Sequence, residues 1–232
     1  MAGALLVLHL ICAAGAIAAF WIAVIAPKRG AMPRRIDRSF ARAVQASAAT
    51  GGLLAVSGMI WPDALSVLSN GDRTATRHFM WFVAYLSILM VAPVQHGLAA
   101  IDAGPSPVRL RSRLHLSLNL AALGGAVALF PASLIWRAWP FLLAVPAGFL
   151  IGLRNMVYAG RASAQPSDWR REYLANLVTT GVVLHTAVFI LAANRWPIVP
   201  ASWAWAPWIG PVLVGGPMIL WIRRSQKLEA RS

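Results

Sequence analysis

Long runs of apolar residues alternate with short polar segments along almost the whole chain. A helix needs about 20 predominantly apolar residues to span a bilayer, because its backbone polar groups must be satisfied within the segment. By this criterion the sequence predicts spans near 3–26, 40–61, 79–100, 114–136, 138–154, 173–194 and 202–222. The predicted fold class is therefore all-α. It is a polytopic membrane helix bundle of about seven transmembrane helices, with residues 1–232 forming one domain.

Proline interrupts two of these runs. Pro140 and Pro146 fall in the short fifth run, which leaves open whether that helix crosses the whole membrane. Pro207, Pro211 and Pro217 fall in the seventh run. Each proline lacks an N–H and clashes with the preceding turn, so we expect the last helix to be kinked or interrupted.

Composition agrees with a membrane protein. The chain is 59% hydrophobic and 12% charged, whereas an average soluble domain is about 25% charged. The net charge of +14 comes from the scarcity of acids, 7 against 21 bases. Because the bases lie in short loops between apolar runs, they indicate membrane topology and not nucleic-acid binding. Cys12 is the only cysteine, so neither a disulfide framework nor a thiolate metal site is predicted.

The basic residues are distributed unevenly between alternate loops. Of the 21 Lys and Arg residues, only Arg73, Arg77, Arg137 and Arg195 lie in one set of segments. By the positive-inside rule the N-terminus is outside and the C-terminus is in the cytoplasm. The predicted location is the bacterial inner membrane, with the lipid bilayer as the first partner. The basic residues nearest the first apolar run follow it and do not precede it. A signal peptide has the opposite order, so we expect this run to be a transmembrane helix that is not cleaved.

Acidic residues are predicted to lie outside the bilayer interior. All seven acids fall in loops or at helix ends by the boundaries above, including Glu172 just before the sixth run. Proton and cation pumps usually carry an intramembrane Asp or Glu, so this argues against ordinary proton-coupled transport. The last run lacks the lysine that retinal would need. No H-x-x-x-H or H-E-x-x-H motif indicates a metal hydrolase, and no metal ligands are predicted.

Histidine is the main candidate for chemistry inside the membrane. His78 and His96 lie 18 residues apart on one face of the third helix, about 27 Å from each other. His96 and His115 are predicted near the cytoplasmic surface, and His9 lies nearer in depth to His78. Paired imidazoles from neighbouring helices could ligate b-type haem and carry electrons across the membrane. The alternative is that these histidines bond headgroups, loop carbonyls or other helices.

The last two helices carry a second group of candidates. Asn176 and Thr180 share a broad polar face of the sixth helix, with His185 turned about 100° or more away from it. Such groups commonly form hydrogen bonds between helices. Gly216 lies in the Gly/Pro-rich seventh helix, where an interrupted helix could expose carbonyls to a substrate. Asn176, Thr180, His185 and Gly216 are the predicted substrate-binding residues.

Several short motifs resemble those of one known family. They are Leu8-His9, Lys28-Arg29-Gly30, Trp169-Arg170-Arg171-Glu172, the segment 185–189 and Gly215-Gly216-Pro217. They resemble an uncharacterised family of bacterial seven-helix integral membrane proteins of unknown function. Pro33-Arg34 stands where that family has His-Arg, and Tyr173 or Leu174 stands where it has a histidine. The resemblance implies the seven-helix topology and implies no activity.

Three functional hypotheses follow from the sequence. The first is a non-catalytic membrane scaffold or accessory subunit, with other membrane-complex subunits as partners. The second is a haem-binding transmembrane redox protein. The third is a carrier or lipid-handling protein that uses the Gly/Pro-interrupted last helix. An enzyme acting on a lipid stays open, although no nucleophile–base pair or metal constellation is visible.

Overall fold

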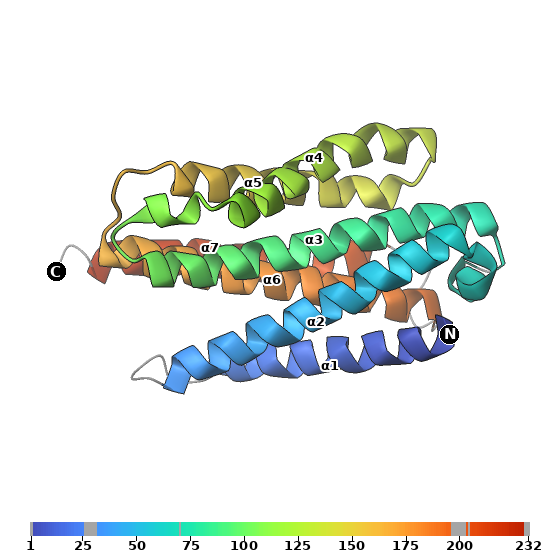
Figure 1. The fold of residues 1–232 in the computed structure, drawn as a ribbon, viewed down its shortest axis with the longest axis horizontal. Coiled ribbons are helices and arrows are strands. Elements are labelled where there is room, and N and C mark those ends of the chain that lie inside the picture. Colours follow the sequence, from blue (N-terminus) through green and yellow to red (C-terminus); the bar gives the residue numbers. More distant parts are fainter. Residues whose placement is uncertain (1, 26–31, 70, 196–202, 204, 230–232) are drawn as a thin grey trace.

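The computed structural model describes the chain except for residues 1, 26–31, 70, 196–202, 204 and 230–232 (Figure 1). The described part is all-α and contains no strand. Its long helices are α1 (Ala2–Ile25), α2 (Met32–Ile60), α3 (Arg73–Ala103), α4 (Arg113–Ile135), α5 (Ala144–Ala159), α6 (Pro166–Arg195) and α7 (Ala206–Glu229). Three short 3₁₀ helices join them: η1 (Pro62–Ser69), η2 (Pro107–Leu110) and η3 (Trp139–Leu143).

The lengths of the helices confirm a polytopic membrane bundle. Six described segments are long and apolar enough to cross a bilayer, and α7 adds a shorter apolar stretch, Ala206–Ile222. η3 and α5 together form a span of 21 residues, Trp139–Ala159. The fifth run therefore has the length and composition of a full span. Its predicted end at 154 is wrong, because the helix continues to Ala159.

Most helices extend beyond their apolar runs. α6 begins at Pro166, not at 173, with proline in its first turn and Asp168 near the positive end of the helix dipole. Asp72 caps α3 by accepting hydrogen bonds from the backbone N–H groups of Thr74 and Ala75. Hydropathy marks the part of a helix that faces lipid, whereas caps and first turns decide where the helix starts.

The last helix is continuous through two of its three prolines. α7 continues as one helix from Ala206 to Glu229, with Pro211 and Pro217 inside it. The predicted interruption is therefore absent from this described helix. Each proline removes one backbone hydrogen bond, and neighbouring helices can support the remaining ones.

α3 is the central helix and packs against α2, α4 and α6, while α1 covers α2, α5 covers α4 and α7 covers α6 (Figure 1). Tyr85 of α3 ties this helix to the α4–α5 pair, because its hydroxyl donates to the carbonyl of Ala122 at 2.9 Å. The Tyr85 ring fits between two glycines. A Cβ at Gly125 would lie 2.4 Å from the ring, and one at Gly148 would lie 1.6 Å from the hydroxyl oxygen.

The two ends of the bundle differ in charge. We call the basic end the one that holds the C-termini of α1, α3, α5 and α7, at the left of Figure 1. Its described arginines are Arg35, Arg38, Arg42, Arg109, Arg111, Arg113, Arg154, Arg161, Arg170, Arg171 and Arg224. The opposite end carries exposed tryptophans, among them Trp61, Trp81 and Trp139. The basic end is the one that the positive-inside rule assigns to the cytoplasm.

Candidate functional site

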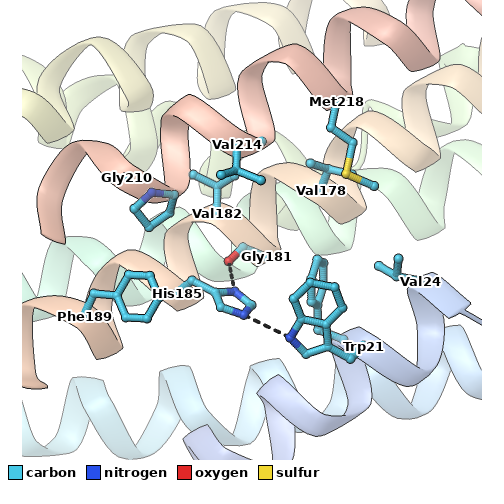
Figure 2. A pocket seen from close by; sticks show the side chains of 13 residues that line it. Trp21, Val24, Val178, Gly181, Val182, His185, Phe189, Gly210, Val214 and Met218 are labelled. Atoms are coloured by element: carbon cyan, nitrogen blue, oxygen red, sulfur yellow. Dashed lines mark hydrogen bonds between the residues drawn. The ribbon is translucent and has the colours of Figure 1, made fainter. Parts of the chain in front are cut away.

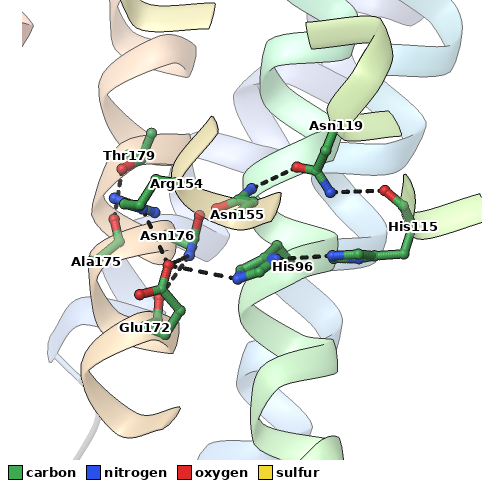
Figure 3. Close-up of polar contacts among 9 residues, drawn as sticks. All are labelled: His96, His115, Asn119, Arg154, Asn155, Glu172, Ala175, Asn176 and Thr179. Atoms are coloured by element: carbon green, nitrogen blue, oxygen red, sulfur yellow. Dashed lines mark hydrogen bonds and ion pairs between the residues drawn. The ribbon is translucent and has the colours of Figure 1, made fainter. Parts of the chain in front are cut away.

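A buried carboxylate, Glu172, is the centre of a polar network at the basic end (Figure 3). Its Oε1 atom lies 3.1 Å from Nε of Arg154 on α5 and 3.6 Å from Nε2 of His96 on α3. The same oxygen accepts a hydrogen bond from Nδ2 of Asn176, one turn further along α6, at 3.1 Å. One carboxylate oxygen therefore faces groups from three helices. We call Glu172, Arg154, Asn176, His96 and His115 the basic-end network.

This carboxylate is buried among the helices, whereas the sequence analysis placed it in a loop or at a helix end. Glu172 is only 9% exposed. The prediction failed because the sixth helix was started at 173, which left Glu172 in a loop. In the structure α6 begins six residues before Glu172. Its side chain therefore projects from the second turn toward α3 and α5.

His96 and His115 are in direct contact. Nδ1 of His96 and Nε2 of His115 are 3.0 Å apart, and the ring centroids are separated by 4.9 Å. His96 is fully buried and His115 is 6% exposed. The sequence placed both histidines at one depth, and the structure brings them together. The contact extends the network from Glu172 through α3 to α4.

Two asparagines hold α5 against α4 beside this histidine pair. Nδ2 of Asn119 donates to the carbonyl of His115 at 2.8 Å, and Nδ2 of Asn155 donates to Oδ1 of Asn119 at 2.8 Å. Both side chains are buried. The close approach of the helices requires glycine at 152, where a Cβ would lie 2.7 Å from the carbonyl oxygen of Asn119. These bonds fix where Arg154, the neighbour of Asn155, enters the network.

The network opens into a pocket between α5, α6 and α7, which we call the basic pocket. It has a volume of about 380 Å³, and its lining residues are Arg154, Val157, Tyr158, Arg161, Asp168, Arg171, Glu172, Leu220 and Arg224. Four arginines therefore face two carboxylates. Nη1 of Arg171 lies 3.8 Å from Oδ1 of Asp168. The lining keeps an excess of positive charge, which favours an anionic ligand.

Tyr158 is the most informative residue of the basic pocket. It is 3% exposed, and its hydroxyl has no hydrogen-bond partner among the described residues. The guanidinium of Arg161 lies 5.3 Å from the centre of its ring, in cation–π geometry. A buried hydroxyl without a partner is rare, because leaving it unbonded costs about 1–3 kcal/mol. A ligand oxygen in the pocket would satisfy it.

The described contacts of the four predicted haem-ligand histidines do not fit haem. The 3.0 Å between the ring nitrogens of His96 and His115 is a hydrogen-bond distance, which leaves no room for iron and a porphyrin between them. Nδ1 of His9 lies 3.1 Å from both the carbonyl of Ser47 and the hydroxyl of Thr50. The His78 ring stacks on Trp136 at 4.2 Å. His9 and His78 thus face different partners. Haem binding stays a prediction that would require these contacts to rearrange.

The four predicted substrate-binding residues lie in two places. Asn176 belongs to the basic-end network, and its carbonyl accepts a hydrogen bond from the hydroxyl of Thr180 at 2.9 Å. His185 instead lines an apolar groove of about 410 Å³ between α1, α6 and α7 (Figure 2). Gly215 also lines the groove, whereas Gly216 points to open space. Adjacent helical residues differ by about 100° in direction, which explains the difference between the two glycines.

His185 is held by two hydrogen bonds in this groove (Figure 2). Its Nδ1 lies 2.7 Å from the carbonyl oxygen of Gly181, and its Nε2 accepts a hydrogen bond from Nε1 of Trp21 at 3.2 Å. Trp21 and His185 thereby join α1 to α6. The rest of the lining is apolar, with Phe20, Phe189 and Met218 among its members.

Sequence reasoning missed Arg154, Tyr158, Arg171 and Glu172. Their spacing did carry a signal. Arg154 and Tyr158 are four residues apart, and Asp168 precedes Arg171 and Glu172 by three and four residues, so each set shares one helical face. That signal becomes readable only when both segments are assigned as helix, and the predicted boundaries stopped at 154 and started at 173.

Comparison of the chain with protein-family models, with curated protein sequences and with solved structures found no match. The resemblance to a seven-helix family of unknown function therefore stays a prediction. The functional argument depends on the geometry of the described residues.

Proposed function

We propose that this membrane protein is a lipid-handling protein that binds the phosphate group of an anionic lipid in the basic pocket. The observation that carries the proposal is the buried, unbonded hydroxyl of Tyr158 in a pocket lined by four arginines. Of the three hypotheses drawn from the sequence, this one develops the third. It moves the ligand site from the last helix alone to the space between α5, α6 and α7.

The chemistry of the lining favours phosphate. A guanidinium presents several N–H donors in a planar fork that matches two oxygens of a phosphate group. Arg154, Arg171 and Arg224 supply such donors from three helices, and Arg161 supplies them from the segment between α5 and α6. The Tyr158 hydroxyl adds a neutral donor at the buried end of the pocket. Together they can hold a group that carries one negative charge over several oxygens.

The rim of the pocket favours a lipid over a free anion. Val157 and Leu220 line the pocket and are 58% and 57% exposed. Both belong to apolar membrane helices, so their exposed surfaces face lipid chains and not water. A headgroup can therefore enter between α5 and α7 while its acyl chains remain in the bilayer. We place this site in the inner leaflet of a bacterial inner membrane, which is rich in anionic lipid.

Native mass spectrometry of the purified protein tests the proposal directly. Wild type is expected to retain phosphatidylglycerol in preference to phosphatidylcholine. Tyr158→Phe removes a hydroxyl that makes no bond within the described structure, so the protein should fold normally. It should bind phosphatidylglycerol about 10- to 100-fold more weakly, since a hydrogen bond to a charged group contributes about 1.5–3 kcal/mol. Arg171→Gln is expected to weaken binding as well.

Arg109→Gln is the matched control, because Arg109 is an exposed arginine of the basic end outside the pocket. It should leave binding unchanged. Sulfate separates the two sources of anion: competition by sulfate at concentrations similar to the lipid would point to a free oxyanion. Equal retention of the two lipids, or equal loss in the Arg109 and Tyr158 variants, would refute headgroup binding at this site.

Two other predictions from the sequence, the scaffold role and the membrane orientation, can be tested separately from this proposal. A scaffold or accessory role predicts co-purifying membrane subunits and no preference among lipids. The proposed orientation predicts that a reporter fused to the C-terminus is active only in the cytoplasm. Activity of that reporter outside the cell membrane would overturn the orientation, and with it the placement of the pocket in the inner leaflet.

A further inference from the structure

We infer that filling the basic pocket is coupled to the uptake of one proton by Glu172, the carboxylate that lies between Arg154 and the buried pair His96 and His115. This inference deepens the proposed function and depends on headgroup binding at the same site. Proton coupling seemed excluded when no carboxylate was expected among the helices. Glu172 supplies that carboxylate, and its contacts join it to both the pocket and the histidines.

Arg154 is the residue through which a ligand would reach Glu172. Its Nε lies 3.1 Å from Oε1 of Glu172, and Arg154 also lines the basic pocket. On the other side of the same oxygen, Nε2 of His96 lies 3.6 Å away, slightly beyond a normal hydrogen bond. Glu172 is thus positioned between a cation that a ligand can compete for and an imidazole that can accept a hydrogen bond.

Charge balance gives the reason for proton uptake. Before binding, the Arg154 cation compensates the Glu172 carboxylate. The pocket as a whole holds more arginines than carboxylates, so the argument concerns this one pair. A phosphate group that engages Arg154 draws the guanidinium away from Oε1 of Glu172 and reduces this compensation. A buried carboxylate without a matching cation is costly, and protonation is the usual way to remove the cost. One proton taken up by Glu172 removes this local cost, so that the complex contains the protein, the headgroup and the proton.

Among the described residues, the other arginines that line the pocket are Arg161, which lies over the Tyr158 ring, Arg171 and Arg224. On α6 itself, Arg171 lies near Asp168, and Asp168 adds negative charge to the pocket. On α7, Arg224 lines the pocket and would face the ligand. On the far side of α6, the Tyr173 hydroxyl bonds Asp37 of α2, which adds another acid and no base.

The histidine pair can stabilise the protonated carboxyl. Nε2 of His96 faces Oε1 of Glu172 at 3.6 Å and its Nδ1 is joined to His115 at 3.0 Å, so His96 can accept a hydrogen bond from the protonated Glu172 while it stays bonded to His115. Tyr158 of α5 packs edge-on against His96, with 5.6 Å between ring centres. The entry point is Glu172, whose side chain is 11% exposed, whereas that of His96 is fully buried. Proton uptake forms an O–H bond on Glu172 and breaks one in a hydronium ion or buffer acid, and the reverse transfer returns the proton to water when the ligand leaves.

Short-chain phosphatidylglycerol is the probe for this coupling, because its phosphodiester does not titrate near neutral pH. Wild-type protein in detergent is mixed with the probe in a weakly buffered solution that contains a pH-sensitive dye. We expect uptake of about one proton per bound lipid, and affinity that rises about tenfold per unit decrease in pH within the coupled range. Glu172→Gln keeps the shape of the side chain and removes its charge, so its binding should be independent of pH.

His9→Gln is the matched control, because His9 is a hydrogen-bonded histidine in α1 that is not part of the network. It should leave proton uptake unchanged, and Glu172→Gln should abolish it. Saturable binding of the probe without proton uptake would overturn the coupling and leave headgroup binding intact. Failure of wild type to bind the probe would overturn both. The number of protons that wild type takes up per bound lipid tests the coupling even if a variant of the network fails to fold.

Discussion

Gly148→Ala tests whether Tyr85 is wedged between α4 and α5 as described. The added Cβ would lie 1.6 Å from the Tyr85 hydroxyl oxygen and 2.9 Å from the carbonyl oxygen of Ala122. The ring has little room to move away, because a Cβ at Gly125 on its other side would lie 2.4 Å from it. Alanine at 148 must therefore displace Tyr85 or separate α5 from α4.

The cost can be worked from these contacts. Overpacking of a filled interior destabilises a protein by about 1–3 kcal/mol. Displacing Tyr85 also breaks its 2.9 Å bond to Ala122 and leaves a buried hydroxyl unbonded, at about 1–3 kcal/mol. The sum is about 2–6 kcal/mol, which for a chain of this size lowers Tm by about 4–24 °C.

Loss of the monodisperse peak in size-exclusion chromatography after heating measures this difference in detergent. Gly124→Ala is the matched control, since a Cβ there meets nothing within 4 Å, and it should keep or slightly raise Tm. In a Tyr85→Phe background the nearest clashing atom is gone, so Gly148→Ala should cost less than it does in wild type. Equal Tm values for the Gly148 and Gly124 variants would refute the described packing.

Two further predictions concern the opposite end of the bundle and the histidines. The Arg73 guanidinium beside Asp63 holds the pKa of that carboxyl below its usual value. The stabilisation is therefore present above the usual aspartate pKa and lost as pH falls through the lowered one, so Asp63→Asn should be less stable than wild type at neutral pH only. A constant difference down to strongly acidic pH would contradict this. A visible spectrum of the purified protein, expressed with abundant haem, should lack a Soret band because His96 already bonds a second imidazole. A Soret band that disappears in His96→Ala would instead establish the haem-binding hypothesis.

The sequence predicted the helical bundle well because a bilayer imposes one strong requirement, a long apolar helix, that hydropathy reads directly. It did not predict the basic-end network, because that network depends on polar first turns and last turns. Glu172 and Tyr158 lie only one and four residues beyond the predicted spans. Because of that small difference in boundaries, the sequence analysis assigned a buried carboxylate and a buried hydroxyl to loops. Which of two adjacent glycines faces the groove, 215 or 216, likewise depends on helix rotation, which the apolar run does not determine.

The link between Trp21 and His185 has a consequence for what the apolar groove can hold. A carbonyl oxygen can only accept, so the 2.7 Å contact with Gly181 places the imidazole proton on Nδ1. The indole N–H then occupies the lone pair of Nε2. His185 is thereby held as a single neutral tautomer with both nitrogens in use, and it can neither ligate a metal nor act as a base without separating α1 from α6. The groove that contains this histidine is thus electrically neutral, and hydrocarbon is the content that suits it.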